Sequence, residues 1–151
     1  MFTGVTCAGH LRPSSLARAI ARDPMNEHDL AAAMQSPPAF ETNEGPDDYA
    51  RFWMPARFGE GMFWVGQWRG TSPWERHPEH EELLCALAGE YEVTILSDVG
   101  EEKLTVKPGT VVVVPRNHWH RVHAAQETTG YGVTPGPTDH HEGDDPRTEG
   151  A

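Results

Sequence analysis

The sequence predicts one all-β domain in which antiparallel strands form a sandwich or a barrel. The 151 residues include 15 glycines and 13 prolines, a turn content that does not suit a bundle of long helices. Between residues 51 and 137, several short segments alternate apolar and polar residues with the period of a strand. The same stretch holds all five tryptophans, a residue type that favours strands. About six to eight short strands at this spacing are typical of a sandwich or barrel.

The strand signals follow one another along the core of the chain. The predicted strands are residues 62–69, 82–87, 90–96, 102–106, 110–114, 118–123 and 131–134. The valine run at 110–114 is too rich in β-branched residues to favour a helix, and its continuous apolar character predicts a strand buried on both faces. The order in which the strands pair does not follow from this pattern.

Residues 1–50 predict an N-terminal extension of short helical and irregular segments. One short helix is expected around Leu16, and Asn26 is expected to cap a second helix through Leu30. Neither helix is long enough to be stable without packing on another element. Residues 41–50 are polar and predict a connector to the core.

The remaining chain divides into a barrel at residues 51–137 and a tail at residues 138–151. The tail carries five acidic residues and one basic residue, and it has no large apolar side chain. Such a segment cannot offset the entropy of ordering by burial, so we expect a disordered acidic tail.

Composition also limits the classes of partner and the compartment. The chain has 12 Lys and Arg against 23 Asp and Glu, a formal net charge of -11, which disfavours nucleic acid and anionic membranes as partners. No apolar run approaches the roughly 18 residues of a membrane span, and no export signal is evident. Cys7 and Cys85 are too few for a disulfide framework, so a cytoplasmic protein is expected.

A first cluster of histidine and carboxylate residues follows the aromatic strand. It reads Glu75-x-His77-x4-Glu82-x6-Gly89. If the segment is extended, Glu75 and His77 share a face because side chains alternate along a strand.

A second cluster follows the valine run. It reads Gly109-x5-Pro115-x-Asn117-x2-His120, so a strand ends in a proline turn and a new strand begins. Imidazole and carboxylate groups from separated strands can build a divalent metal site that leaves room for a substrate.

These two segments resemble the paired motifs of the cupin superfamily, which read Gly-x5-His-x-His-x(3–4)-Glu-x6-Gly and Gly-x5-Pro-x-Gly-x2-His-x3-Asn. The resemblance covers about residues 58–134 and implies a small single-domain metal-binding cupin. Its fold would be a double-stranded β-helix, a jelly-roll barrel. The chain departs from the pattern at Glu75, where the family usually has a histidine, and at Asn117 and Ala124, which replace Gly and Asn.

The resemblance implies His77, Glu82 and His120 as ligands of one divalent ion, with Glu75 as a possible fourth. This donor set favours Fe, Zn or Mn and disfavours cuprous copper. If Glu75 is not a ligand, it is the best candidate for a general base beside the ion. His118 shares strand parity with His120 and is a second candidate for moving a proton. The alternative is that these side chains line a barrel that binds no metal.

The leading functional hypothesis is a metal-dependent enzyme that acts on a small organic molecule inside the barrel, with oxygenase or dioxygenase chemistry favoured by what is common in the family. Redox-neutral isomerase, lyase or cyclase chemistry is the first alternative. A small-molecule-binding or sensor module without turnover is the second, and an accessory subunit with a structural barrel is the third. The N-terminal extension is expected to cover a partner subunit in a homodimer.

Overall fold

The computed structural model describes residues 27–148, and these residues are almost entirely strand. The all-β prediction is confirmed. The helix predicted around Leu16 and the last residues of the chain lie outside the described part. The strands are β1 (Phe40–Gly45), β2 (Asp48–Phe58), β3 (Gly61–Thr71), β4 (Trp74–Arg76), β5 (Glu82–Ala88), β6 (Tyr91–Ser97), β7 (Gly100–Val106), β8 (Val111–Val114), β9 (His120–Pro135) and β10 (Asp139–His141).

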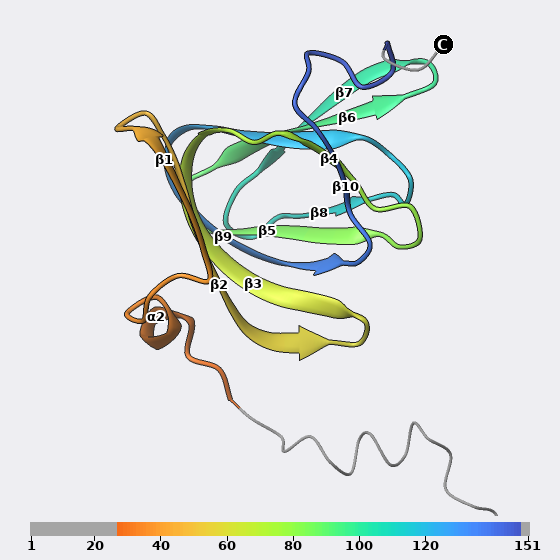
Figure 1. The fold of residues 1–151 in the computed structure, drawn as a ribbon. Coiled ribbons are helices and arrows are strands. Elements are labelled where there is room, and N and C mark those ends of the chain that lie inside the picture. The colour runs from red at the N-terminus through yellow and green to blue at the C-terminus, as the bar shows by residue number, and fades with distance from the viewer. Residues whose placement is uncertain (1–26, 149–151) are drawn as a thin grey trace, which may run out of the picture.

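The strands form one antiparallel sheet that curls around a central strand. The main path runs β1-β2-β3-β9-β4-β10. Strand β9 also pairs with β5 and β6, which in turn pair with β8 and β7. Because β9 contributes to pairs with β3, β4, β5 and β6, it bends the sheet into the barrel that Figure 1 shows. The predicted jelly-roll barrel is therefore confirmed.

Aromatic side chains fill much of the barrel and set how closely its strands approach. Trp64, Trp68 and Tyr91 are buried in one cluster with Val93. Gly132 on β9 lies under Trp64, and a Cβ atom at this position would stand 2.1 Å from the carbonyl oxygen of Leu83. Only glycine permits this close approach of β9 to β5.

The segment before residue 51 is part of the sheet rather than a connector. Residues 41–50, predicted as a polar link, form most of β1 and the start of β2, which pair as a hairpin. The second predicted helix is a single turn, α2 (Leu30–Ala33), and Asp29 caps it in place of Asn26. The connector prediction is therefore wrong, because polar side chains are tolerated on an exposed edge strand.

Three other expectations need correction. Strand β8 is not buried on both faces, because Val111 and Val113 are each more than half exposed and, among the described strands, β8 pairs only with β5. Residues 118–123 and 131–134 do not form two separate strands, since one long strand, β9, contains most of both. The prediction of a disordered tail is wrong for residues 139–141, which form β10 and pair with β4.

The C-terminal segment is held to the barrel by side chains as well as by β10. Arg76 on β4 binds Asp139 through two nitrogens at 2.6 and 3.0 Å. The indole nitrogen of Trp74 donates to the carbonyl of Asp144. Arg147 then reaches the carbonyls of Ser97 and Gly100 in the β6–β7 hairpin. These polar contacts hold the segment on the barrel although it has no large apolar side chain to bury. None of the helices in residues 27–148 has the length and apolar character to cross a membrane.

Candidate metal centre

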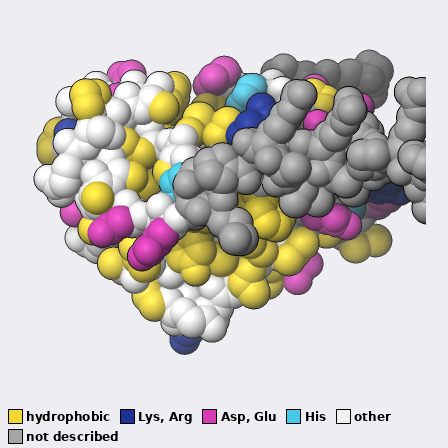
Figure 2. Space-filling view, turned by 90° about the horizontal axis from the view of Figure 1, so that it is seen from below, with side chains coloured by type: hydrophobic (Ala, Val, Ile, Leu, Met, Phe, Trp, Pro, Cys, Tyr) yellow, Lys and Arg dark blue, Asp and Glu magenta, His cyan; other side chains and the backbone are white. Residues whose placement is uncertain are grey.

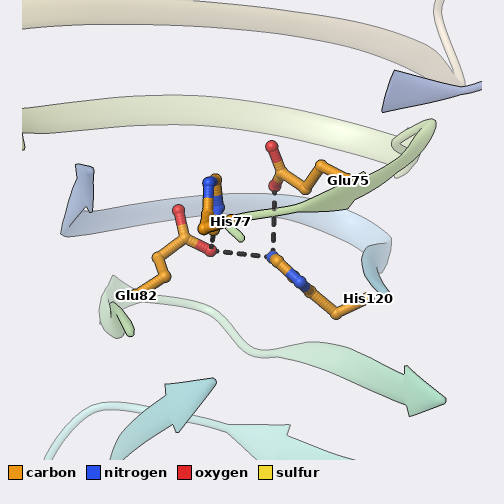
Figure 3. Close-up of side chains that lie close together, drawn as sticks. All are labelled: Glu75, His77, Glu82 and His120. Carbon is orange, nitrogen blue, oxygen red and sulfur yellow. Dashed lines mark hydrogen bonds and ion pairs between the residues drawn. The ribbon is translucent and has the colours of Figure 1, made fainter. Parts of the chain in front are cut away.

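Four side chains from three strands and one loop converge inside the barrel. Glu75 lies on β4, His77 in the loop after it, Glu82 at the start of β5 and His120 at the start of β9. Glu75 pairs directly with His120 in the β4–β9 register. One potential ligand atom from each residue lies within 4.8 Å of the others, and Figure 3 shows the side chains pointing toward one another. The structure thus brings together the four residues that the sequence indicated.

A turn before β9 holds the two motifs in place. Asn117 has a φ of 63°, a left-handed conformation that asparagine adopts more readily than most residues. Its backbone N–H donates to the carbonyl of His77 at 2.7 Å. Because this bond joins the turn to the loop after β4, it fixes the separation between His77 and His120.

Glu82 is the centre of the cluster. Its Oε2 atom lies 2.9 Å from Nε2 of His120 and 3.5 Å from Nε2 of His77. Its Oε1 atom accepts a short hydrogen bond from the hydroxyl of Thr134. The carboxylate of Glu75 completes the group, with Oε1 at 3.5 Å from Nε2 of His120. The Glu82, His77 and His120 side chains are at most 2% exposed, whereas that of Glu75 is 26% exposed.

Hydrogen bonds at the far side of each ring orient the two imidazoles. Nδ1 of His120 lies 3.1 Å from the carbonyl of His118, and since a carbonyl only accepts, Nδ1 carries the proton. Thr138 donates its hydroxyl proton to the carbonyl of Pro135 at 3.5 Å and accepts from Nδ1 of His77 at 3.1 Å. Both rings therefore turn Nε2 toward the carboxylates, which is the arrangement that metal-binding histidines use.

The cluster strongly shifts two protonation equilibria in the metal-free protein. Burial alone would raise the pKa of Glu82, but the hydrogen bond from His120 and the adjacent imidazole of His77 outweigh it and lower the pKa to about 2. Burial alone would lower the pKa of His120, but hydrogen bonds to Glu75 and Glu82 raise it to about 10. Without metal, a proton on His120 therefore compensates part of the negative charge of the two carboxylates.

The residues fit a divalent ion on two grounds. Nε2 of His77 is buried and has no hydrogen-bond partner among the described residues, and an unpaired buried nitrogen is costly unless something binds it. The contacts of 2.9 and 3.5 Å also lie within about 0.1 Å of the 3.0–3.4 Å range expected between adjacent ligand atoms that each lie about 2.1 Å from one ion. Two imidazoles and two carboxylates can therefore hold one borderline divalent metal.

A cavity of about 670 Å³ opens beside the cluster, and Glu75 and Glu82 form part of its wall. Trp64, Trp68 and Phe52 also line it. This volume is within the range of sites that enclose a small organic ligand. The candidate metal centre therefore faces a space that can hold such a molecule.

Residues 62–131 match the family model described as "Cupin domain". A cupin-2 domain containing protein from Shewanella frigidimarina has a TM-score of 0.50 at 18% identity, over 56% of this chain and 79% of its own. A cupin superfamily protein from Desulfitobacterium hafniense has a TM-score of 0.51 at 16% identity, over 61% and 82%. A deletion mutant of oxalate decarboxylase from Bacillus subtilis has a TM-score of 0.54 at 13% identity, over 72% and 31%. None of the curated proteins matches the chain.

Residues 62–131 therefore form a cupin domain. The match to the family model contains all four residues of the cluster. Two side chains that orient this cluster, Thr134 and Thr138, lie beyond it. At these identities the solved structures show the fold that this cupin shares, and its reaction has to be argued from its own residues.

The structure does not bring every candidate residue of this cupin to the cluster. Nδ1 of His118 lies 3.0 Å from the carbonyl of Arg116, and His118 is not among the described residues that line the cavity. Trp119, beside it, packs against the guanidinium of Arg76. Glu75 is therefore the one predicted proton-handling residue that the structure places in the cavity wall.

Sequence reasoning missed the residues that support the cluster. Thr138 was assigned to a disordered tail, and no spacing in either motif indicates that its hydroxyl reaches His77. Trp64 and Trp68 are buried in the core, and both also line the cavity. Their separation by four residues on one strand, β3, puts them on the same face of the sheet, which is the signal that was available.

Proposed function

We propose that this cupin is a metal-dependent enzyme that acts on a small organic molecule in its barrel cavity, with oxygenase chemistry as the leading reaction class. The observation that carries the proposal is the convergence of four potential ligand atoms within 4.8 Å at the wall of a cavity of about 670 Å³. A binding pocket without turnover does not require a buried carboxylate next to a buried imidazole nitrogen that has no hydrogen-bond partner.

His77, Glu82 and His120 would hold the ion, because they are the buried members of the cluster. When bound, a divalent ion supplies Lewis-acid polarisation, and Fe(II) additionally supplies redox chemistry with dioxygen. Thr138 and the carbonyl of His118 keep Nε2 of each imidazole directed toward the site. The apolar wall excludes water from the reacting molecule, which suits an oxidation that water would disturb.

Glu75 has two alternative roles. It is the most exposed member of the cluster and lies in the cavity wall, so its carboxylate can accept a proton from a bound molecule. A base in this position would equally serve redox-neutral isomerisation, elimination or cyclisation with Zn or Mn. The variant Glu75→Gln separates the roles, because loss of metal identifies a ligand, whereas retained metal with lost turnover identifies a base. A homodimer and a cytoplasmic location stay predictions.

Metal analysis tests the proposal. Protein purified without chelator is expected to hold close to one divalent ion per chain, and His77→Ala and His120→Ala are expected to lose it. His123→Ala is the matched control. His123 is exposed, lies on β9 like His120, and bonds to Thr71 outside the cluster. Metal missing from the unchanged protein after loading with Fe, Zn and Mn would refute the proposal. Oxygen uptake by Fe(II)-loaded protein with candidate substrates then separates oxygenase from redox-neutral chemistry.

A further inference from the structure

We propose that the cavity selects an uncharged aromatic compound that carries a hydroxyl or carbonyl oxygen, and that it discriminates against carboxylates. The inference rests on the proposed function only in assuming that the molecule binds beside the metal. It is carried by the side chains of the cavity wall, by their charges, and by the donor set of the cluster.

Aromatic rings form the inner wall of the cavity. Phe52 stacks on Trp68 with ring centroids 5.9 Å apart, and Trp64 meets Phe52 edge-on at 5.4 Å. Tyr91 packs edge-on against Trp68 at 4.9 Å. All four residues line the cavity, and such an array offers both faces and edges to a flat ring.

The mouth of the cavity is also apolar. Phe40 and Met54 line the cavity and are about half exposed, so they border its opening. Apolar side chains gather on the face of the molecule that Figure 2 shows, with acidic side chains among and beside them. Apolar side chains therefore line the path from this opening to the metal centre. Contact with them favours binding of a molecule with a large apolar surface.

The charged groups of the wall all have the wrong sign for an anionic molecule. Glu75, Glu82 and Glu142 line the cavity, whereas the described lining residues include no lysine or arginine. The nearby Arg76 is already engaged by Asp139 and by the ring of Trp119. Burying a carboxylate without a cationic or hydrogen-bonding partner is strongly unfavourable.

The carboxylates of the cluster also neutralise the positive charge of a bound divalent ion, which would otherwise attract an anion. Glu75 and Glu82 together carry two negative charges, which balance the two positive charges of a divalent ion. A site built from three histidines and one carboxylate would instead keep one positive charge to attract an anion. Here the ion and its ligands are neutral together, and Glu142 adds a negative charge nearby. A neutral oxygen donor therefore fits better than a carboxylate.

His140 provides a polar contact for such an oxygen. It lies in the cavity wall and pairs with Glu75 in the β4–β10 register. Within residues 27–148, the imidazole of His140 makes no hydrogen bond to another side chain or to the backbone. Its imidazole can therefore donate to or accept from a hydroxyl or carbonyl group of the bound molecule.

The test uses 4-hydroxybenzamide and 4-hydroxybenzoate, which have nearly the same shape and differ in charge. Both are titrated by calorimetry at pH 6.5 into Zn-loaded and metal-free protein. The amide is expected to bind at least about tenfold more tightly than the benzoate. Glu142→Gln is expected to raise the affinity for the benzoate severalfold and to leave that for the amide unchanged. Glu81→Gln, which removes an exposed carboxylate outside the cavity, is the matched control and should change neither.

Equal or tighter binding of the benzoate would overturn the inference, and so would a Glu142→Gln variant indistinguishable from Glu81→Gln. The outcomes also separate the inference from the proposed function. Protein that holds metal but binds neither compound contradicts the inference alone. Protein that holds no metal yet prefers the amide contradicts the proposed function alone, because the aromatic wall and Glu142 act without the ion.

Discussion

The two motif segments and the C-terminal segment contribute to the same site in different ways. The motifs place Glu75, His77, Glu82 and His120 on or beside β4, β5 and β9, where strand register holds them. The C-terminal segment, residues 138–148, adds no member to the cluster, but Thr138 fixes the orientation of His77. Sequence motifs thus identify the side chains that can bind an ion. The side chains that orient these ligands can come from a segment that has no motif.

Removing charge at the centre of the motif cluster should have the largest effect. Glu82→Gln keeps the shape of the side chain but loses the anion that contacts both histidines. We expect at least an approximately hundredfold loss of Zn affinity, because a central ligand is lost together with its compensation of the ion's charge. Competition with a chromophoric chelator measures it, and unchanged affinity would mean that Glu82 is not a ligand.

The pH dependence of metal binding should follow His120. Its pKa is raised to about 10 in the metal-free protein, so between about pH 6.5 and 10 an incoming ion must displace this proton. Zn affinity should rise by up to about tenfold per pH unit in that range. Calorimetry at pH 8 in two buffers of different ionisation enthalpy should show release of about one proton. Binding without proton release would contradict the assignment of His120.

The stability of the metal-free protein should depend on pH through the same two groups. The pKa of His120 is raised from 6.5 to about 10, so its contribution is complete below pH 6.5 and is lost as pH rises toward 10. The pKa of Glu82 is lowered from 4.5 to about 2, so its contribution is present above pH 4.5 and is lost as pH falls toward 2. Urea unfolding should therefore show the largest contribution of the cluster between about pH 4.5 and 6.5, and a His120→Ala variant should lose this profile.

The role of the C-terminal segment can be isolated with Thr138→Val. The substitution keeps the volume of the side chain but removes the hydroxyl that accepts from Nδ1 of His77. We expect about a tenfold loss of Zn affinity, the usual effect of removing a group that orients a ligand, with little change in folding. Thr148→Val is the control, because its hydroxyl bonds only to Asp145 within the segment. Equal affinities of the two variants would show that the segment does not act on the cluster.

The smallest effect is expected from the ion pair that docks the segment. Arg76 and Asp139 are about one-third or more exposed, so their attraction is screened by solvent. Asp139→Asn should lower the free energy of unfolding by less than about 1 kcal/mol, as measured by urea denaturation. A loss of several kcal/mol would mean that this pair, rather than β10 and Trp74, holds the segment on the barrel.

The difference between the two regions also explains what the sequence could predict. Alternating residues in the core predicted strands, and the resemblance of the two motifs to those of cupins implied that His77, Glu82 and His120 converge. Strand register then holds these residues in place. The tail was predicted wrongly because its attachment depends on single contacts, such as those of Asp139 and Arg147, that leave no periodic pattern. The exposure of Val111 and Val113 was missed because composition does not reveal that β8 lies at an edge.

X-ray absorption at the zinc edge of the loaded protein tests the central claim most directly. The structure predicts a first shell of nitrogen and oxygen atoms at about 2.0–2.2 Å, with the outer scattering of two imidazole rings. In His120→Ala, the scattering of one ring should disappear, while His123→Ala should match the unchanged protein. A first shell without imidazole, or one that contains sulfur, would show that the ion binds elsewhere and would contradict the assignment of this cluster.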